Sequence, residues 1–184
     1  MLRRDDGRNF EPFSPSGHRF EGDLSPDTLI TAVFFELFAN SAIFSELDSS
    51  QIEKVVRVCH VDELKLGECI FREGDEGDRL YLIAEGAVRI SRTIPGSGEE
   101  ALVVLKEGSY FGEMSLFDGQ PRSTDAIVDS RCLLLSITRE SFVDLMDSDK
   151  DLAYKVLSAM VRILSERLRA SNEQLRSIMV MAMF

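Results

Sequence analysis

The spacing of apolar residues predicts helices at both ends of the chain and strands between them. Apolar residues recur every three or four positions after Ser25, which we interpret as an N-cap followed by Pro26 at the first helical position. The first helix would carry Leu29, Val33, Leu37 and Phe38 on one face, and a second helix, starting near Ser49 or Ser50, would carry Ile52, Val55, Val56 and Cys59. Residues 1–25 show no such period and are rich in Gly, Pro and Ser, so we expect a flexible N-terminal arm.

From Val61 the pattern changes to short alternating or apolar runs that glycines interrupt. Leu80 and Leu82 read as one strand, and a turn at Glu85-Gly86 would lead into a second. No helical interval is long enough for repeated βαβ units, so a doubly wound parallel sheet is disfavoured. The sequence therefore predicts N-terminal helices over 26–60, an all-β sandwich or roll over 61–138, and C-terminal helices over 139–184.

The C-terminal region should hold a short helix after Thr138 and a long one from Asp151. Steps of four and three residues give the long helix the seam of a coiled coil, made of Leu157, Val161, Leu164, Leu168, Ser171, Leu175 and Ile178. We expect a homodimer through this helix. The alternative is that its first part packs on the sheet and the rest is solvated. The apolar end "SIMVMAMF" fits an interface, a segment that packs on the roll, or a truncation point.

Composition narrows the function. A net charge of -11 argues against nucleic-acid binding and requires a local positive group to capture any small anion. Two histidines without ligand spacing supply neither a metal site, as a cupin-type enzyme needs, nor a catalytic triad, so we expect neither metal nor enzyme activity. No apolar run approaches the roughly 18 residues of a membrane span. We expect the three cysteines to be buried free thiols, as in a reducing compartment. Together with the lack of an apolar span, they predict a cytoplasmic protein that binds no membrane.

The segment "FGEMSLFDGQPRST", residues 111–124, combines an acid and a guanidinium on either side of an apolar run. A short helical turn after Gly112 would leave its first amides free for an anion. Arg122, stiffened by Pro121, suits a phosphate, and Glu113, a pure acceptor, suits a ribose hydroxyl. By spacing alone, the two charged residues are also compatible with an ordinary ion pair across a loop.

This segment resembles the phosphate-binding cassette of the cyclic nucleotide-binding domain family, found in protein kinase A regulatory subunits, catabolite activator protein and cyclic nucleotide-gated channels. The family pattern is Phe-Gly-Glu, an apolar residue, a small residue and Leu, then Pro-Arg and two small residues, and residues 111–124, hereafter the cassette, fill it without a gap. "FREGDEGDRLYLIAEGAVRIS" is similar to the family's upstream strands and "IFSELDSSQIEKVV" to its preceding helix, so the likeness covers about residues 43–169. It implies an eight-stranded antiparallel β-roll, mainly β, between helices.

The resemblance also implies a ligand site. Its residues would be Phe111, Gly112, Glu113, Met114, Ser115, Arg122, Ser123 and Thr124, with Arg122 on the cyclic phosphate, Glu113 on the ribose 2′-hydroxyl, and the amides of Gly112, Ser115 and Ser123 on the remaining oxygens. An apolar residue of the last helix would cap the base, and the candidates are Met160, Leu164 and Leu168. Ser123 in place of Thr favours cAMP over cGMP. Asp125, if it points inward, would weaken phosphate binding.

The expected protein is a regulatory switch whose long helix closes over the bound nucleotide and contacts an effector protein. Only about 15 residues follow Arg169, which leaves no room for the DNA-binding domain of a catabolite activator protein. The alternatives are a degenerate β-roll that serves as a ligand-free dimerisation or docking module, and a regulatory fragment of a larger effector.

Overall fold

The structure is a computed structural model and describes residues 34–94 and 96–181. The predicted arm and the predicted start of the first helix at Ser25 lie outside these residues. Residues 34–40 are helical, and α2 (Ser49–Arg57) follows, as predicted. A capping box fixes its start, because the Asp48 carboxylate accepts a hydrogen bond from the Gln51 amide while the Gln51 side chain accepts one from the Asp48 amide.

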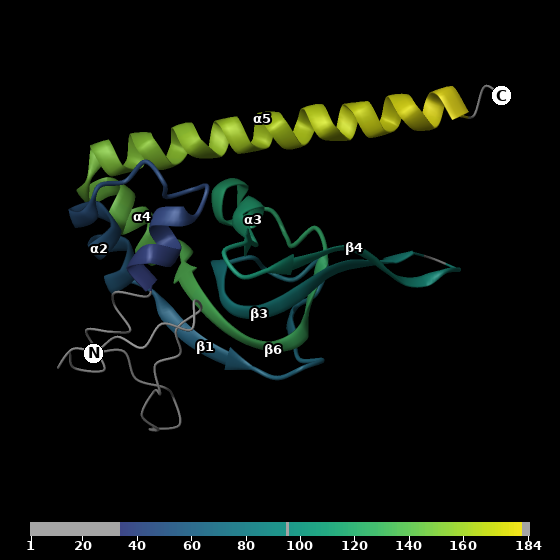
Figure 1. The fold of residues 1–184 in the computed structure, drawn as a ribbon, viewed down its shortest axis with the longest axis horizontal. Helices are drawn as coiled ribbons and strands as arrows, with labels where there is room; N and C mark the ends of the chain where they lie inside the picture. Colours follow the sequence, from purple (N-terminus) through teal and green to yellow (C-terminus); the bar gives the residue numbers. More distant parts are fainter. Residues whose placement is uncertain (1–33, 95, 182–184) are drawn as a thin grey trace.

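Six strands in the described part of the chain form one antiparallel sheet that curls into a roll (Figure 1). They are β1 (His60–Leu64), β2 (Cys69–Phe71), β3 (Arg79–Ile94), β4 (Gly98–Lys106), β5 (Tyr110–Phe111) and β6 (Asp125–Thr138). The strand order is β1-β6-β3-β4, with β2 paired to β6 and β5 paired to β3. The predicted fold class, mainly β with flanking helices and a long C-terminal helix, is confirmed.

The expected turn at Glu85-Gly86 is wrong, because β3 runs through it as one strand of 16 residues. Its pairing with β6 shifts register between Ile83 and Val88, so the glycine lies in a bulged bend of the strand. Gly86 has φ 90°, and a Cβ added there would lie 2.2 Å from the Arg131 carbonyl oxygen. Both long strands, β3 and β6, continue unbroken through this bend, and the described part of the chain has six strands rather than the expected eight.

The hydrophobic core has two parts. The larger lies where the helices meet the roll and includes the fully buried rings of Phe34, Phe38 and Phe44. The smaller fills the inside of the roll. The cysteines are free thiols, and Cys59 and Cys132 are buried as expected, but Cys69 is exposed because it occupies an outward position in the short strand β2.

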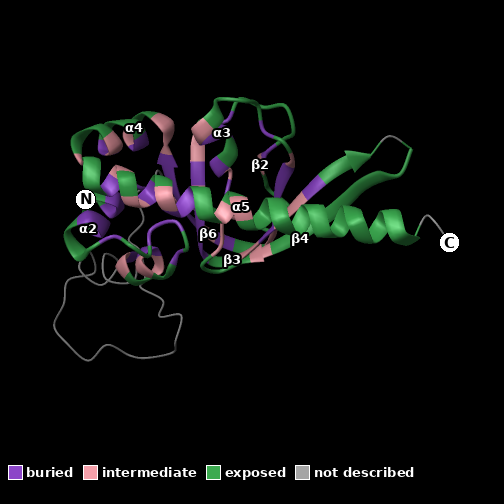
Figure 2. Cartoon of the chain, turned by 90° about the horizontal axis from the view of Figure 1, so that it is seen from above, coloured by how far each residue is buried: buried purple, intermediate pink, exposed green. Residues whose placement is uncertain are grey.

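Two helices follow the roll, α4 (Arg139–Ser148) and α5 (Lys150–Met181). Leu152, Val156, Ala159 and Met160 bury the first turns of α5 in the core. The second half of α5 extends beyond the roll and is exposed on all sides (Figures 1 and 2). The apolar members of the predicted seam are exposed along both halves of α5, from Leu164 at 43% to Val161 at 65%.

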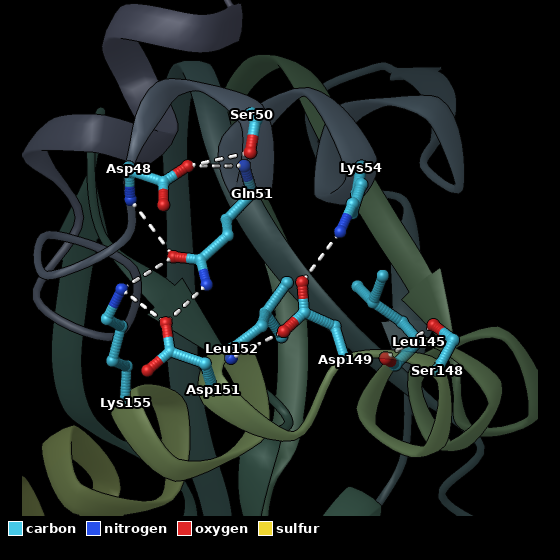
Figure 3. Close-up of polar contacts among 10 residues, drawn as sticks. All are labelled: Asp48, Ser50, Gln51, Lys54, Leu145, Ser148, Asp149, Asp151, Leu152 and Lys155. Carbon is cyan, nitrogen blue, oxygen red and sulfur yellow. Dashed lines mark hydrogen bonds and ion pairs between the residues drawn. The ribbon is translucent and has the colours of Figure 1, made fainter.

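Polar contacts fix the start of α5 to α2 (Figure 3). Buried Gln51 donates to the Asp151 carboxylate at 2.8 Å and accepts from Lys155 at 3.0 Å. Lys155 also pairs with Asp151, and Lys54 of α2 pairs with Asp149, both at 2.7 Å. We call these five residues the α2–α5 clamp. It holds the first turn of α5 while leaving the far end of the helix unattached to α2.

Candidate functional site

A cavity of about 410 Å³ is lined by residues of the roll, of the cassette helix α3 (Glu113–Asp118) and of α5. All eight residues that the sequence singled out in the cassette line it: Phe111, Gly112, Glu113, Met114, Ser115, Arg122, Ser123 and Thr124. Six other residues complete the lining, and the sequence analysis did not single them out: Phe71, Ile90, Val103, Leu105, Tyr110 and Arg167. The structure thus adds an apolar wall and one cation to the predicted set.

Arg122 lies at the polar end of the cavity and is only 4% exposed. Its Nη1 donates to the Gly112 carbonyl oxygen at 2.8 Å and its Nη2 to the Arg79 carbonyl oxygen at 2.9 Å. Its buried Nε has no hydrogen-bond partner in the structure. Burial lowers the pKa of this guanidinium, which still stays protonated at neutral pH. A fixed cation whose Nε has no hydrogen-bond partner is therefore buried beside the cavity.

Aromatic rings support this guanidinium from one side. Its central carbon lies 4.2 Å from the centroid of the Phe71 ring, within the range of a cation–π contact. Phe71 in turn contacts Phe111, and Phe111 stacks on Tyr81 with ring centroids 5.0 Å apart. Because all these rings come from strands of the roll, the position of Arg122 is set by the sheet as well as by its own loop.

The main chain of Arg122 is held as firmly as its side chain. The Gly74 amide donates to the Arg122 carbonyl oxygen and the Arg122 amide donates to the Asp75 carbonyl oxygen, both at 2.8 Å. The same loop brings Gly77 against the cassette, where an added Cβ would lie 2.1 Å from the Cβ of Ser115. A glycine is therefore required at position 77 so that this loop can pack directly against the Ser115 side chain, a role that its position in a glycine-rich sequence did not reveal.

The helix α3 presents its acid and its hydroxyl to the cavity. Gly112 precedes it with φ 76° and supplies no side-chain cap, so the first-turn amides lack the acceptor that a Ser or Asp cap would give. A Cβ at Gly112 would also lie 2.6 Å from Nη1 of Arg122. The predicted short helical turn at Glu113 is confirmed, and it runs to Asp118.

Glu113 is buried and pairs with a residue of the long helix. Its Oε1 accepts a charge-assisted hydrogen bond from Nη1 of Arg167. The Arg167 guanidinium also lies 5.4 Å from the centroid of the Tyr110 ring on the cavity wall. Arg167 itself is half exposed, so this contact joins a buried carboxylate to a partly solvated cation. It is a direct link between the cassette and α5.

Asp125 does not line the cavity, although it is buried. Its carboxylate accepts a hydrogen bond from the Glu73 amide at 2.7 Å and pairs with Arg72 at 3.4 Å. The negative charge, which the sequence analysis expected to weaken phosphate binding if it pointed inward, is therefore held by the neighbouring loop. Ser123 and Met114, by contrast, are exposed at the rim of the cavity.

The three candidate base caps lie in different surroundings. Met160 is 3% exposed and packs in the larger core, because it faces the roll together with Val156. Leu164 and Leu168 are exposed on α5 and do not line the cavity. The residue of α5 that does line it is Arg167, which lies between them. The heptad pattern identifies only apolar positions, so it could not indicate that Arg167, a charged residue next to these positions, lines the cavity.

The site as a whole has a polar end and an apolar wall. The polar end contains Arg122 and, on α3, Glu113 and Ser115, while Ile90, Val103 and Leu105 from β3 and β4 supply the apolar side. This arrangement suits a small ligand with one anionic group, a hydroxyl donor and a flat apolar part. Within residues 34–94 and 96–181 no group of three or more His, Cys, Asp or Glu is placed to hold a metal ion. Nor does any helix there combine the length and apolarity that a bilayer span needs.

Comparison with known proteins identifies similar sequences. The family model of the cyclic nucleotide-binding domain matches residues 61–149. The CRP-like cAMP-activated global transcriptional regulator of Mycobacterium tuberculosis is 29% identical over 143 residues, which are 78% of this chain and 62% of the regulator. The chain thus spans less than two thirds of the length of this relative.

Solved structures show the same similarity. The N-terminal domain of a transcriptional regulator from Streptomyces coelicolor superimposes with a TM-score of 0.66 at 30% identity, covering 76% of this chain and 94% of that one. The catabolite activator protein of Thermus thermophilus gives a TM-score of 0.68 at 32% identity, covering 75% of this chain and 63% of that one.

Proposed function

The chain belongs to the cyclic nucleotide-binding domain family, and we propose that it is a regulatory module that binds cAMP, in preference to cGMP, and responds through α5. The observation that carries the proposal is Arg122, buried beside the cavity with an unpaired Nε and facing a site that also contains Glu113. The name of the M. tuberculosis relative, a cAMP-activated regulator, supports the choice of nucleotide. The proposal includes no catalytic step.

The ligand would lie with its charged end at the cassette. The cyclic phosphate would contact Arg122 and the amides of Gly112, Ser115 and Ser123, and the ribose 2′-hydroxyl would donate to Glu113. The base would lie toward the apolar wall formed by β3 and β4. Because Arg167 already lines the cavity, we propose that it covers the ligand together with Leu164 or Leu168 on the same helix.

Glu113 connects binding to the response. Arg167 uses only Oε1 of this carboxylate, which leaves Oε2 for the ribose hydroxyl. Ligand and helix would then share one carboxylate, and binding would shift the population of α5 positions by its effect on the pair of Glu113 with Arg167. The two segments would have different roles: residues 61–138 would hold the nucleotide, and residues 139–184 would transmit the conformational change to an effector protein.

A homodimer through α5 is part of the proposal. Apolar residues that repeat at steps of four and three and lie exposed on one helix need a partner, and a second α5 matches this pattern. The net charge of -11 disfavours nucleic acid as a partner, because binding to phosphate backbones depends on clustered Lys and Arg. If the cavity takes up no nucleotide, the same exposed seam supports the second candidate function, a ligand-free dimerisation module.

Calorimetric titration of the Arg122→Ala variant with cAMP tests the function. Loss of one partner of a buried charge-assisted pair costs about 2–5 kcal/mol, so the Kd should rise by roughly thirtyfold or more. Arg131, which pairs with Glu63 on the outside of the roll, provides the matched control Arg131→Ala, whose Kd should not change.

Two further titrations, with cGMP and with a cyclic dinucleotide, test the choice of ligand. We expect weaker binding of both than of cAMP. Because Arg122→Ala also leaves two carbonyl oxygens without their donor, circular dichroism should first show that the variant is folded at the titration temperature. An unchanged cAMP affinity in a folded Arg122→Ala protein rejects the proposed site.

A further inference from the structure

Arg139, the first residue of α4, contacts the cassette from outside the cavity. Its Nη2 donates to the carbonyl oxygen of Ser115, in the middle of α3. The same carbonyl oxygen accepts the Gly119 amide at 3.1 Å, so two donors converge on this one oxygen. Arg139 is not among the residues that line the cavity. Any effect it has on a ligand must therefore act through the residues that it contacts.

The end of α3 is shaped to admit this guanidinium. Gly119, which follows the helix, has φ 71°, and a Cβ placed there would lie 3.1 Å from Nη1 and 3.2 Å from Nη2 of Arg139. A glycine therefore provides both the left-handed turn and the space for the side chain. A cation beside the last carbonyls of a helix is also favourable for its dipole.

The main chain of Arg139 supports the other side of the site. Its amide donates to the Asp78 carbonyl oxygen at 2.6 Å. Asp78 directly precedes Arg79, whose carbonyl oxygen accepts the Nη2 hydrogen bond of Arg122. One residue thus contacts the helix that presents Glu113 and Ser115 and also the segment that orients Arg122.

A second contact lies next to the first. Phe117 of α3 meets Phe142 of α4 edge to face, with ring centroids 5.4 Å apart. This apolar contact fixes the distance between the two helices but permits them to rotate. The hydrogen bond from Arg139 is directional, so it restricts the orientation of α3 about its axis, together with the pair that Glu113 forms with Arg167. That orientation decides whether Glu113 and Ser115 face the cavity.

We propose that Arg139 is a positioning residue for the ligand site: it holds α3 in the orientation that presents Glu113 and Ser115 before a ligand arrives. This inference deepens the proposed function and rests on it as far as the ligand is concerned. Without Arg139 the ligand itself would have to order α3, and the lost order would reduce affinity although no ligand contact is removed. The ligand-free protein should show the effect as well, as greater mobility of α3.

The experiment compares Arg139→Met, Arg139→Lys and the control Arg131→Ala with the unaltered chain. Methionine keeps a stem of similar size but no donor, and lysine keeps the charge but not the planar fork. Hydrogen exchange of the amides of residues 113–119 is measured without ligand, and the Kd for cAMP is measured by calorimetry. We expect Arg139→Met to accelerate exchange in α3 and to raise the Kd, each about tenfold, with Arg139→Lys in between.

The pattern of exchange separates positioning from a general loss of stability. Amides of β6 and α2 should exchange as in the unaltered chain, since a merely structural role would accelerate them too. Unchanged exchange in α3, or equal acceleration throughout the protein, overturns the proposal. If Arg139→Met does not fold, Arg139→Lys alone decides by the same two measurements.

The failure of the proposed function gives a different result. An unaltered chain that binds no cAMP, combined with α3 exchange that depends on Arg139, would reject the nucleotide and retain the role of Arg139 in orienting the cassette. An unaltered chain that binds cAMP with the same Kd in all variants would reject the positioning role and retain the nucleotide.

Discussion

The contact between Glu113 and Arg167 predicts that these two residues are energetically coupled in ligand binding. Glu113→Gln keeps the size of the side chain but removes its charge, and Arg167→Met keeps the stem but removes the cation. In the structure the carboxylate is 5% exposed and the guanidinium 51%, so the pair lies between a surface and a buried ion pair. We therefore expect a coupling of about 1 kcal/mol, at the upper end of the range for exposed pairs.

The binding energies follow from the same geometry. A hydrogen bond from a ribose hydroxyl to a buried carboxylate contributes about 1.5–3 kcal/mol, so Glu113→Gln should weaken cAMP binding roughly thirtyfold. Arg167→Met should weaken it about fivefold, because it removes the group that holds the carboxylate in place. If Arg167 acts through Glu113, the double variant should lose no more than Glu113→Gln alone.

Calorimetry on the four proteins, with Arg169→Met as a control on the same helix, measures the cycle. Titration with 2′-deoxy-cAMP adds a check from the ligand side, because removal of the hydroxyl should weaken binding to the unaltered chain but not to Glu113→Gln. Losses in the two single variants that add up in the double variant within about 0.3–0.5 kcal/mol would refute the reasoning, since Arg167 would then act independently of Glu113.

Three other predictions concern close packing, assembly and pH. Gly77→Ala should lower the free energy of unfolding by about 1–3 kcal/mol and abolish cAMP binding, because the new methyl group overlaps Ser115; denaturant unfolding and calorimetry measure both effects. Leu168→Asp should convert a dimer to a monomer with unchanged thermal unfolding of the roll, as sedimentation velocity and circular dichroism would show. Hydrogen bonds from Lys54 and Lys155 lower the pKa of Asp149 and Asp151. The clamp therefore stabilises the fold at pH values above the ordinary carboxylate pKa, and this stabilisation is lost as the pH falls through the lowered pKa values, below about pH 4. Hydrogen exchange at the start of α5 should accelerate over that pH range, and Asp151→Asn serves as the comparison.

The parts of the site that come from one continuous segment were predictable from the sequence. Gly112, Glu113 and Arg122 lie within a dozen residues of one another, and the residue types themselves carry the chemistry of anion binding. The net charge of -11 strengthened the argument, because an acidic protein can capture a small anion only with a local positive group, and Arg122 is such a group. The structure adds the hydrogen bonds to Gly112 and Arg79 that fix the guanidinium, and these depend on how β3 lies against the cassette.

The parts that depend on tertiary contacts were not predictable. Arg167 is 54 residues from Glu113, and only the direction of α5 brings them together. Gly86 illustrates a different limit, because a tight turn and a bulge both require a glycine with positive φ, and local sequence does not distinguish them. Met160 shows that helical spacing finds apolar faces without saying which face meets the roll: it packs in the core, while Leu164 does not.

The contacts along α5 indicate where a response to ligand would appear. The clamp fixes its first turns, Arg162 pairs with Glu46, and Arg167 pairs with Glu113; beyond Arg167 every described residue of the helix is exposed. Glu113 is thus the last described point at which the body holds the helix. The 14 residues that follow Arg167, 168–181, extend about 21 Å further at 1.5 Å per residue. A small tilt at the Glu113 contact would be enlarged along this length, so residues 168–181, with their exposed apolar side chains, are where a partner would detect that nucleotide is bound.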